Sequence, residues 1–232
     1  MSQTLKIAII GDYNFTYNSH HATNLALDHS SNFLDLDISY YWTKISEVVK
    51  FRPYHFEEYD GFWIAPGPYK NEFFLHGIIR ELLNKPTPTI VTGDAYRIFL
   101  EVLINLYQLN PHKEKLISDN LVDGEQFEKI QLSPHSKAFQ KLYENYSKVE
   151  LTSTRFSMYP QLIEALTKDL TDIEANNQFE EPEVLSLRHH DFFLACGFCP
   201  QISSTREIPH PIIYTFLKAC EALNMQNMKR SS

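Results

Sequence analysis

A sharp turn between a strand and a helix is the place in this sequence best suited to hold a reactive group. Residues 87–105 read TPTIVTGDAYRIFLEVLIN, which predicts a β-branched strand, a tight turn at Thr92-Gly93-Asp94 and a long amphipathic helix. A strand that turns abruptly into a helix lifts the turn residue above the sheet and points free helix N–H groups at it. That geometry suits a nucleophile. The turn has no serine or cysteine, and Thr92 carries its only hydroxyl.

A second candidate for chemistry is the CxxC motif at residues 196–199, which is typical of redox and metal sites. Redox pairs of this type begin a helix after an early strand, whereas this motif ends a late strand and precedes Pro200. Zinc would need two more ligands, and strand alternation turns Cys196 and Cys199 to opposite faces. We therefore predict one core thiol and one rim thiol, with no metal and no cofactor. The histidines near enough in sequence to complete a zinc site are His189, His190 and His210.

Strands and helices alternate over the first 108 residues, which predicts an α/β fold with a doubly wound, mostly parallel sheet. Ligands of such sheets bind outside the carboxyl ends of the strands. Three loops, at 11–19, 66–71 and 92–96, are expected to share that rim. Four tyrosines fall on it and predict either an aromatic, hydrogen-bonding pocket or ordinary packing: Tyr13, Tyr17, Tyr69 and Tyr96.

The second half of the chain is less regular, but no linker divides it from the first. We expect one domain over residues 1–223 and a flexible tail over 224–232. Strands are predicted at 127–132, 148–152, 170–175, 183–188 and 192–197, and helices at 136–145, at 159–168 and from 209 onward.

Composition narrows the class of protein. The 232 residues are 43% hydrophobic and carry a net charge of −8 without a long basic block, which argues against nucleic acid as a partner. No apolar run is long enough for a membrane helix, and the first ten residues lack a signal-peptide pattern. Three cysteines are too few for a disulfide framework, so we expect a cytoplasmic protein.

Several segments together resemble the glutamine amidotransferase domain of CTP synthase, a class I glutamine amidotransferase, and especially the free-standing proteins related to that carboxy-terminal domain. They lie in the family's order between about residues 5 and 222. They read IAIIGDY, DGFWIAPGPY, TGDAYRIFLE, HDFFLACGFCPQ and PHPIIYTFLKA. The resemblance implies a glutamine-hydrolysing Cys-His-Glu triad.

Each triad position is changed in this chain. The resemblance assigns the nucleophile to Thr92, the histidine to Cys199 and the glutamate to Gln201. A hydroxyl needs a base to remove its proton, whereas a thiol ionises readily near neutral pH. His190 is the nearest histidine that matches close relatives, so it is either a replacement base or the end of a strand.

The expected oxyanion hole is changed as well, because the family's PGG-type turn reads Pro66-Gly67-Pro68 and Pro68 has no N–H to donate. We therefore predict a non-catalytic relative that binds a small, glutamine-like polar metabolite or a partner protein. The alternative is a divergent amidotransferase or amidohydrolase in which Thr92 or Cys199 attacks with His190 as base, acting with a separate synthetase. The expected ligand-binding residues are Gly67, Pro68, Tyr69, Gly93, Asp94 and Tyr96.

Overall fold

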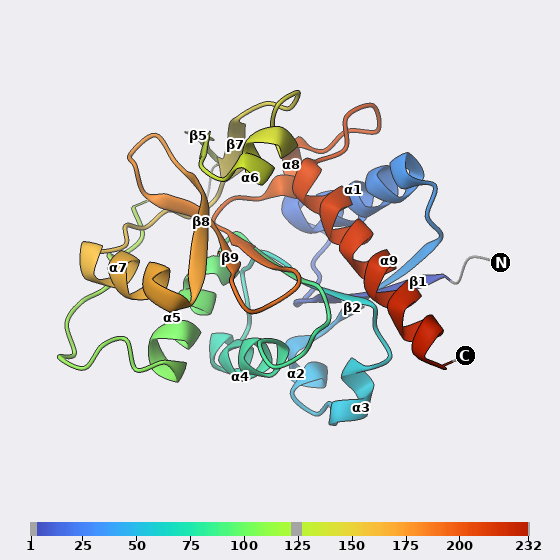
Figure 1. Ribbon diagram of the computed structural model, residues 1–232, viewed down its shortest axis with the longest axis horizontal. Helices are drawn as coiled ribbons and strands as arrows, with labels where there is room; N and C mark the ends of the chain where they lie inside the picture. Colours follow the sequence, from blue (N-terminus) through green and yellow to red (C-terminus); the bar gives the residue numbers. More distant parts are fainter. Residues whose placement is uncertain (1–3, 122–126, 232) are drawn as a thin grey trace.

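The fold is built on one mixed sheet with helices on both faces (Figure 1). The computed structural model describes residues 4–121 and 127–231. The described strands are β1 (Leu5–Ile10), β2 (Ile38–Thr43), β3 (Gly61–Ile64), β4 (Thr89–Thr92), β5 (Glu128–Gln131), β6 (Ser133–Pro134), β7 (Val149–Thr152), β8 (Thr171–Asn176), β9 (Pro182–Leu187) and β10 (Phe193–Cys196). Eight of them form the main sheet in the order β2-β1-β3-β4-β10-β9-β8-β6.

The strand directions divide this sheet into two parts. β2, β1, β3, β4 and β10 are parallel, as the alternation of strands and helices predicts. β9, β8 and β6 extend the sheet as antiparallel strands, and β5 pairs with β7 in a separate two-stranded sheet. The carboxyl ends of the five parallel strands therefore meet at one edge, where ligands of such sheets bind.

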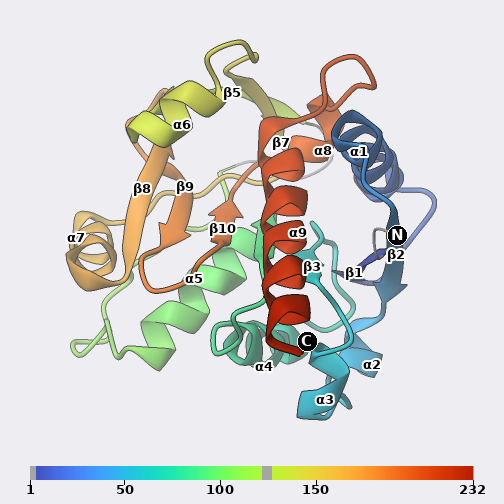
Figure 2. The ribbon, with the colours of Figure 1, turned by 45° about the vertical axis from the view of Figure 1, so that its right-hand side comes forward.

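The helices cover the sheet in two groups. One face carries α1 and α9, which contact each other and cross the sheet side by side (Figures 1 and 2). The other face carries α4 and α5, which also contact each other. The helices are α1 (Asn18–Leu34), α2 (Ile45–Val48), α3 (Pro53–Phe56), α4 (Glu72–Leu82), α5 (Ala95–Leu106), α6 (Lys137–Leu142), α7 (Pro160–Asp169), α8 (Pro200–Ser203) and α9 (Pro211–Ser231).

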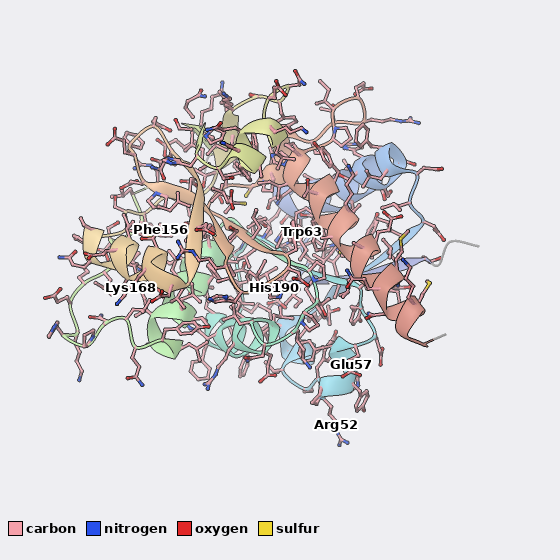
Figure 3. The ribbon with its side chains drawn as sticks, viewed as in Figure 1. Arg52, Glu57, Trp63, Phe156, Lys168 and His190 are labelled. Atoms are coloured by element: carbon pink, nitrogen blue, oxygen red, sulfur yellow. The ribbon has the colours of Figure 1, made fainter. Side chains whose placement is uncertain are left out.

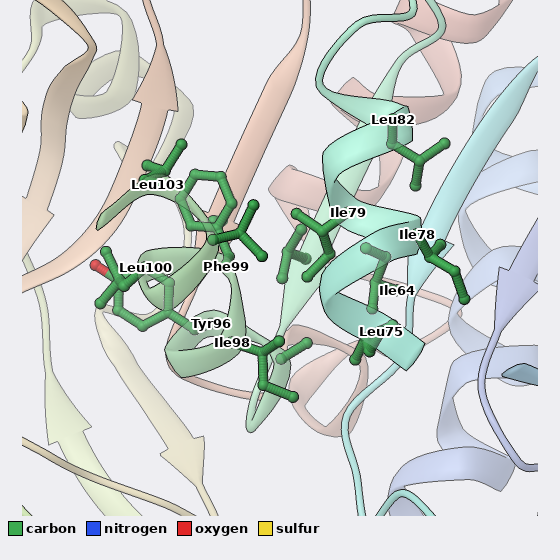
Figure 4. Packing of buried hydrophobic residues seen from close by; sticks show 14 of the residues in the cluster. Ile64, Leu75, Ile78, Ile79, Leu82, Tyr96, Ile98, Phe99, Leu100 and Leu103 are labelled. Atoms are coloured by element: carbon green, nitrogen blue, oxygen red, sulfur yellow. The ribbon is translucent and has the colours of Figure 1, made fainter. Parts of the chain in front are cut away.

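The hydrophobic core forms two clusters, one on each face of the sheet, because successive residues of a strand point to opposite faces. In β1, Ile7 and Ile9 join the cluster under α1 and α9, whereas Ala8 and Ile10 join the cluster under α4 and α5. Figure 4 shows the apolar side chains of α4 and α5 meeting in the second cluster. A strand buried on both faces explains why LKIAII is almost wholly apolar.

The predicted α/β fold with a mostly parallel sheet is confirmed. The segment predicted as a flexible tail is instead helical as far as Ser231, because α9 continues past residue 223. Its Asn224 side chain donates a hydrogen bond of 2.7 Å to Asp60, which ties the helix to the loop before β3. Residues 1–3 and 232 lie outside the described part. Within the described residues, no helix is both long and apolar enough to span a membrane.

Candidate functional site

The turn between β4 and α5 has the expected elbow shape, but its tip is Gly93. Gly93 has a φ of +62°, a left-handed conformation that glycine adopts without strain. Thr92 lies one residue below the tip and is fully buried. Its hydroxyl accepts a hydrogen bond of 3.0 Å from Trp63 Nε1 and donates one of 3.3 Å to the Ile64 carbonyl. Thr92 thus bonds to the neighbouring strand β3 through Trp63, which is fully buried and is labelled in Figure 3.

Gly93 faces Cys199, the residue that the resemblance assigns to the histidine of the triad. A Cβ placed on Gly93 would lie 3.3 Å from Cys199 Sγ and 2.7 Å from the Pro66 Cβ. The tip of the turn is therefore one residue after Thr92, the position that the resemblance assigns to the nucleophile. The residue at the tip has no side chain, and Pro66 leaves no room for one.

Asp94 fills the space beside the turn that follows β3. A Cβ on Gly67 would lie 2.4 Å from Asp94 Oδ2, so the carboxylate packs directly against this backbone. Burial raises the pKa of Asp94, and the polar groups of Thr154 and of the Gly67 backbone beside the carboxylate partly offset the rise. The other oxygen, Oδ1, is buried without a hydrogen-bond partner among the described residues.

Cys199 lies at the expected place for the base but lacks the properties of one. It is fully buried at the start of α8, and its N–H donates a 2.9 Å hydrogen bond to the Leu151 carbonyl. Burial, and then the nearby Asp94 carboxylate, raise the pKa of the thiol far above its usual range. A thiol in this setting is protonated at neutral pH.

Gln201 follows two residues later and is also buried. Its Nε2 donates a hydrogen bond of 3.4 Å to the Ser19 carbonyl, and its Oε1 has no partner among the described residues. Gln201 therefore packs α8 against the start of α1 and supplies no carboxylate.

His190 lies at the opposite end of the parallel strands from the elbow, so the structure does not bring it to Thr92 or Cys199. β10 runs parallel to β4, with Phe193 opposite Thr89 and Cys196 opposite Thr92. The strand alone separates its two ends by about 10 Å, and His190 precedes the amino end. Its Nε2 lies 2.6 Å from the Lys85 carbonyl, and its Nδ1 accepts a hydrogen bond from the Phe192 N–H. Through these contacts His190 connects the loop before β10 to the loop between α4 and β4.

His20 is the histidine that the structure places near the elbow. It is buried, with Nε2 3.1 Å from the Pro66 carbonyl and Nδ1 accepting a 3.0 Å hydrogen bond from the Asn14 N–H. These partners define the neutral tautomer with its proton on Nε2. Burial lowers the pKa of His20. His20 therefore joins the loop after β1 to the turn after β3.

The predicted rim tyrosines separate into two groups. Tyr13, Tyr17 and Tyr69, with Pro68, line a pocket of about 470 Å³ at the carboxyl ends of β1, β2 and β3. Tyr96 does not belong to it. Its ring is buried in the core, and its hydroxyl donates a 3.0 Å hydrogen bond to the Pro182 carbonyl. Tyr96 is the second residue of α5 and faces the interior, whereas the sequence analysis placed it in a loop at the rim.

The CxxC cysteines are both buried, and the described residues include no group of three or more His, Cys, Asp or Glu side chains arranged to hold a metal ion. His210, a zinc candidate by sequence, instead lies 2.9 Å from Glu150 Oε1 through its Nε2. The same carboxylate accepts hydrogen bonds from Tyr143 and Ser203. This buried cluster fixes β7, α8 and the start of α9 together.

Comparison with solved structures gives the same fold. The glutaminase domain of Trypanosoma brucei CTPS, solved with bound acivicin, superposes with a TM-score of 0.70 at 17% identity, over 94% of each chain. A protein from Thermoplasma acidophilum, described as a GMP synthase subunit, gives 0.64 at 10% identity, over 97% of this chain and 98% of that one. A glutamine amidotransferase from Thermotoga maritima gives 0.54 at 10% identity, over 94% and 96%.

Sequence comparison is more limited. No protein-family model matches the chain. CTP synthase of Phytoplasma australiense is 28% identical over 102 residues, which is 43% of this chain and only 18% of that relative. The chain thus has the fold of a class I glutamine amidotransferase and is similar in both structure and sequence to CTP synthase, whose glutaminase domain is among its structural neighbours.

Proposed function

We propose that this chain is a non-catalytic relative of the CTP synthase glutaminase domain, which keeps the fold and has lost glutamine hydrolysis. The observation that carries the proposal is the Asp94 carboxylate packed against the Gly67 backbone, beside a turn whose tip is Gly93. In acyl transfer, donors of this kind stabilise the negative charge that develops on the substrate oxygen. Here the Asp94 carboxylate occupies the space beside the Gly67 backbone, where the substrate oxygen would have to lie.

Electrostatics supports the same conclusion. Two negative charges 4 Å apart repel each other by about 4 kcal/mol at an effective dielectric constant of 20. An ionised Asp94 therefore disfavours an oxyanion next to Gly67, and a protonated one still blocks the space. The absent side chain at position 93 and the protonated thiol of Cys199 remove the attacking group and the base.

The retained role is binding, at the edge formed by the carboxyl ends of the parallel strands. Glutamine amidotransferase domains act beside a synthetase, so the two candidates are a small polar metabolite and a synthetase-type partner protein. The divergent enzyme with Thr92 or Cys199 as nucleophile and His190 as base finds no support in the geometry, because His190 lies at the other end of β10.

Ammonia release from glutamine by the purified chain tests the proposal. The wild type is compared with Thr92→Ala, Cys199→Ala and His190→Ala at equal concentration. We expect no release above the protein-free blank in any of the four. Release that one of these substitutions abolishes would overturn the proposal and identify a replacement catalytic group.

A further inference from the structure

The pocket of about 470 Å³ at the ends of β1, β2 and β3 is separate from the elbow at the end of β4. Its walls come from the loop after β1, the end of β2 and the turn after β3. Its volume falls in the range of about 300–1,000 Å³ that is usual for small-molecule sites. The three residues that the resemblance assigns to the triad do not line this pocket: Thr92, Cys199 and Gln201.

Its place in the sheet is the one where open α/β folds bind ligands. The strand order β2-β1-β3-β4 reverses direction at β1, so the chain leaves β1 toward β2 on one side and reaches β3 on the other. A crevice opens at such a switch point, and in sheets with this order it lies between β1 and β3. The pocket contains residues from both of the loops that flank this crevice.

Aromatic rings form its walls, and hydrogen bonds hold two of them in place. Trp42 Nε1 donates a 2.7 Å hydrogen bond to Asn24, and the Tyr69 hydroxyl donates one to the Ala65 carbonyl. The Tyr13 ring lies 4.9 Å from the Trp42 ring in an edge-on arrangement, yet 42% of Tyr13 remains exposed. Rigid, partly exposed rings of this kind offer stacking surfaces to a planar ligand.

The charges at the pocket favour an anion. Lys44 and Lys70 both line it, and neither forms an ion pair with any described residue. The one carboxylate among the lining residues, Asp12, accepts a hydrogen bond of 3.2 Å from the Lys70 N–H. Two lysines and one aspartate give a local charge of 2 − 1 = +1, on a chain whose net charge is −8.

We infer that this pocket binds a planar ring that carries a phosphate, of the nucleoside monophosphate class, with the ring against Trp42 and Tyr13 and the phosphate between Lys44 and Lys70. The start of α1 adds to the attraction for the phosphate, because Tyr17 makes no side-chain cap there and the first turn has no acidic residue. This inference goes beyond the loss of catalysis proposed above, and either can fail without the other.

Isothermal titration of the full chain with AMP, GMP, CMP and UMP tests the inference. Guanosine and inorganic phosphate, titrated separately, report the ring and the anion alone. We expect saturable binding of at least one nucleotide, at least tenfold tighter than either fragment. Trp42 supplies a second readout, because the only other tryptophan, Trp63, is fully buried. Quenching of tryptophan fluorescence should follow the same binding curve.

Charge-matched variants locate the site. Lys44→Ala and Lys70→Ala should each weaken nucleotide binding by about tenfold. Lys50→Ala removes an equal charge from an exposed position outside the pocket and should leave the affinity unchanged. The inference is overturned by the absence of saturable binding for all four nucleotides, by phosphate alone binding as tightly as a nucleotide, or by equal losses in all three variants.

Discussion

The Asp94 carboxylate packs directly against the backbone of Gly67, where a Cβ would lie 2.4 Å from Asp94 Oδ2. This contact joins the elbow after β4 to the turn after β3, the two segments that form the reactive centre of an amidotransferase in the family that the sequence resembles. On the proposed function, the Asp94 side chain takes the space in which the oxyanion of a substrate would form.

The hydrogen bond between Trp63 and Thr92 predicts that the hydroxyl of Thr92 is structural. Thr92→Val leaves the buried Trp63 N–H without its acceptor, which costs about 1–3 kcal/mol in the free energy of unfolding. Urea denaturation followed by circular dichroism measures this loss. Thr92→Ser keeps the oxygen and should lose less than the valine variant. Equal stability of the valine variant and the wild type would show that this bond contributes nothing.

The backbone at Gly93 predicts a second loss of stability. Gly93→Ala places a Cβ 2.7 Å from Pro66 on a residue with φ +62°, and we expect a cost of about 1–3 kcal/mol. Gly77→Ala is the matched control, because Gly77 lies inside α4 and a Cβ there meets nothing within 4 Å. That variant should gain up to about 1 kcal/mol. If the Gly93→Ala protein is as stable as the wild type, the turn has room for a side chain at this position and the close packing against Pro66 is contradicted.

Glu183 predicts a pH dependence of stability. Burial raises its pKa to about 7 from a reference of 4.5, although a hydrogen bond from Asn177 opposes the rise. A raised folded-state pKa means that the folded chain holds the proton more tightly than the unfolded chain. The stabilisation is thus fully present below pH 4.5 and is lost as the pH rises through about 7.

Thermal unfolding between pH 4 and pH 9 measures this effect. Glu183→Gln should remove the decline in stability with rising pH and leave the variant more stable than the wild type near pH 8, by roughly 3 kcal/mol. Glu164→Gln removes an equal charge from an exposed position on α7 and should keep the wild-type profile. The same pH profile in the Glu183 variant would assign the dependence to other groups.

Local sequence pattern was sufficient for the parallel half of the fold. The apolar run of β1 and the strand, turn and helix around Gly93 follow from the spacing of apolar residues and from turn chemistry. Resemblance found the neighbourhood of Cys199 and Gln201. It assigned the nucleophile to Thr92, whereas the left-handed φ that marks the tip belongs to Gly93 and depends on the folded backbone.

Other features depend on long-range packing that no local pattern contains. The direction of β10 decides that His190 lies far from the elbow, and the inward face of α5 decides that Tyr96 is buried. The contact of Asp94 with Gly67 depends on how two loops 27 residues apart in sequence meet. The pocket tyrosines were predicted from the loops, whereas the role of His20 between those loops was not.

The release of ammonia from glutamine by the wild-type chain, followed over pH 6–9 beside Cys199→Ala, tests the central claim most directly. The account predicts rates equal to the protein-free blank for both proteins at every pH, because the tip has no side chain and Asp94 occupies the space beside Gly67. A wild-type rate above the blank that disappears in Cys199→Ala would contradict it and make this chain a working glutaminase.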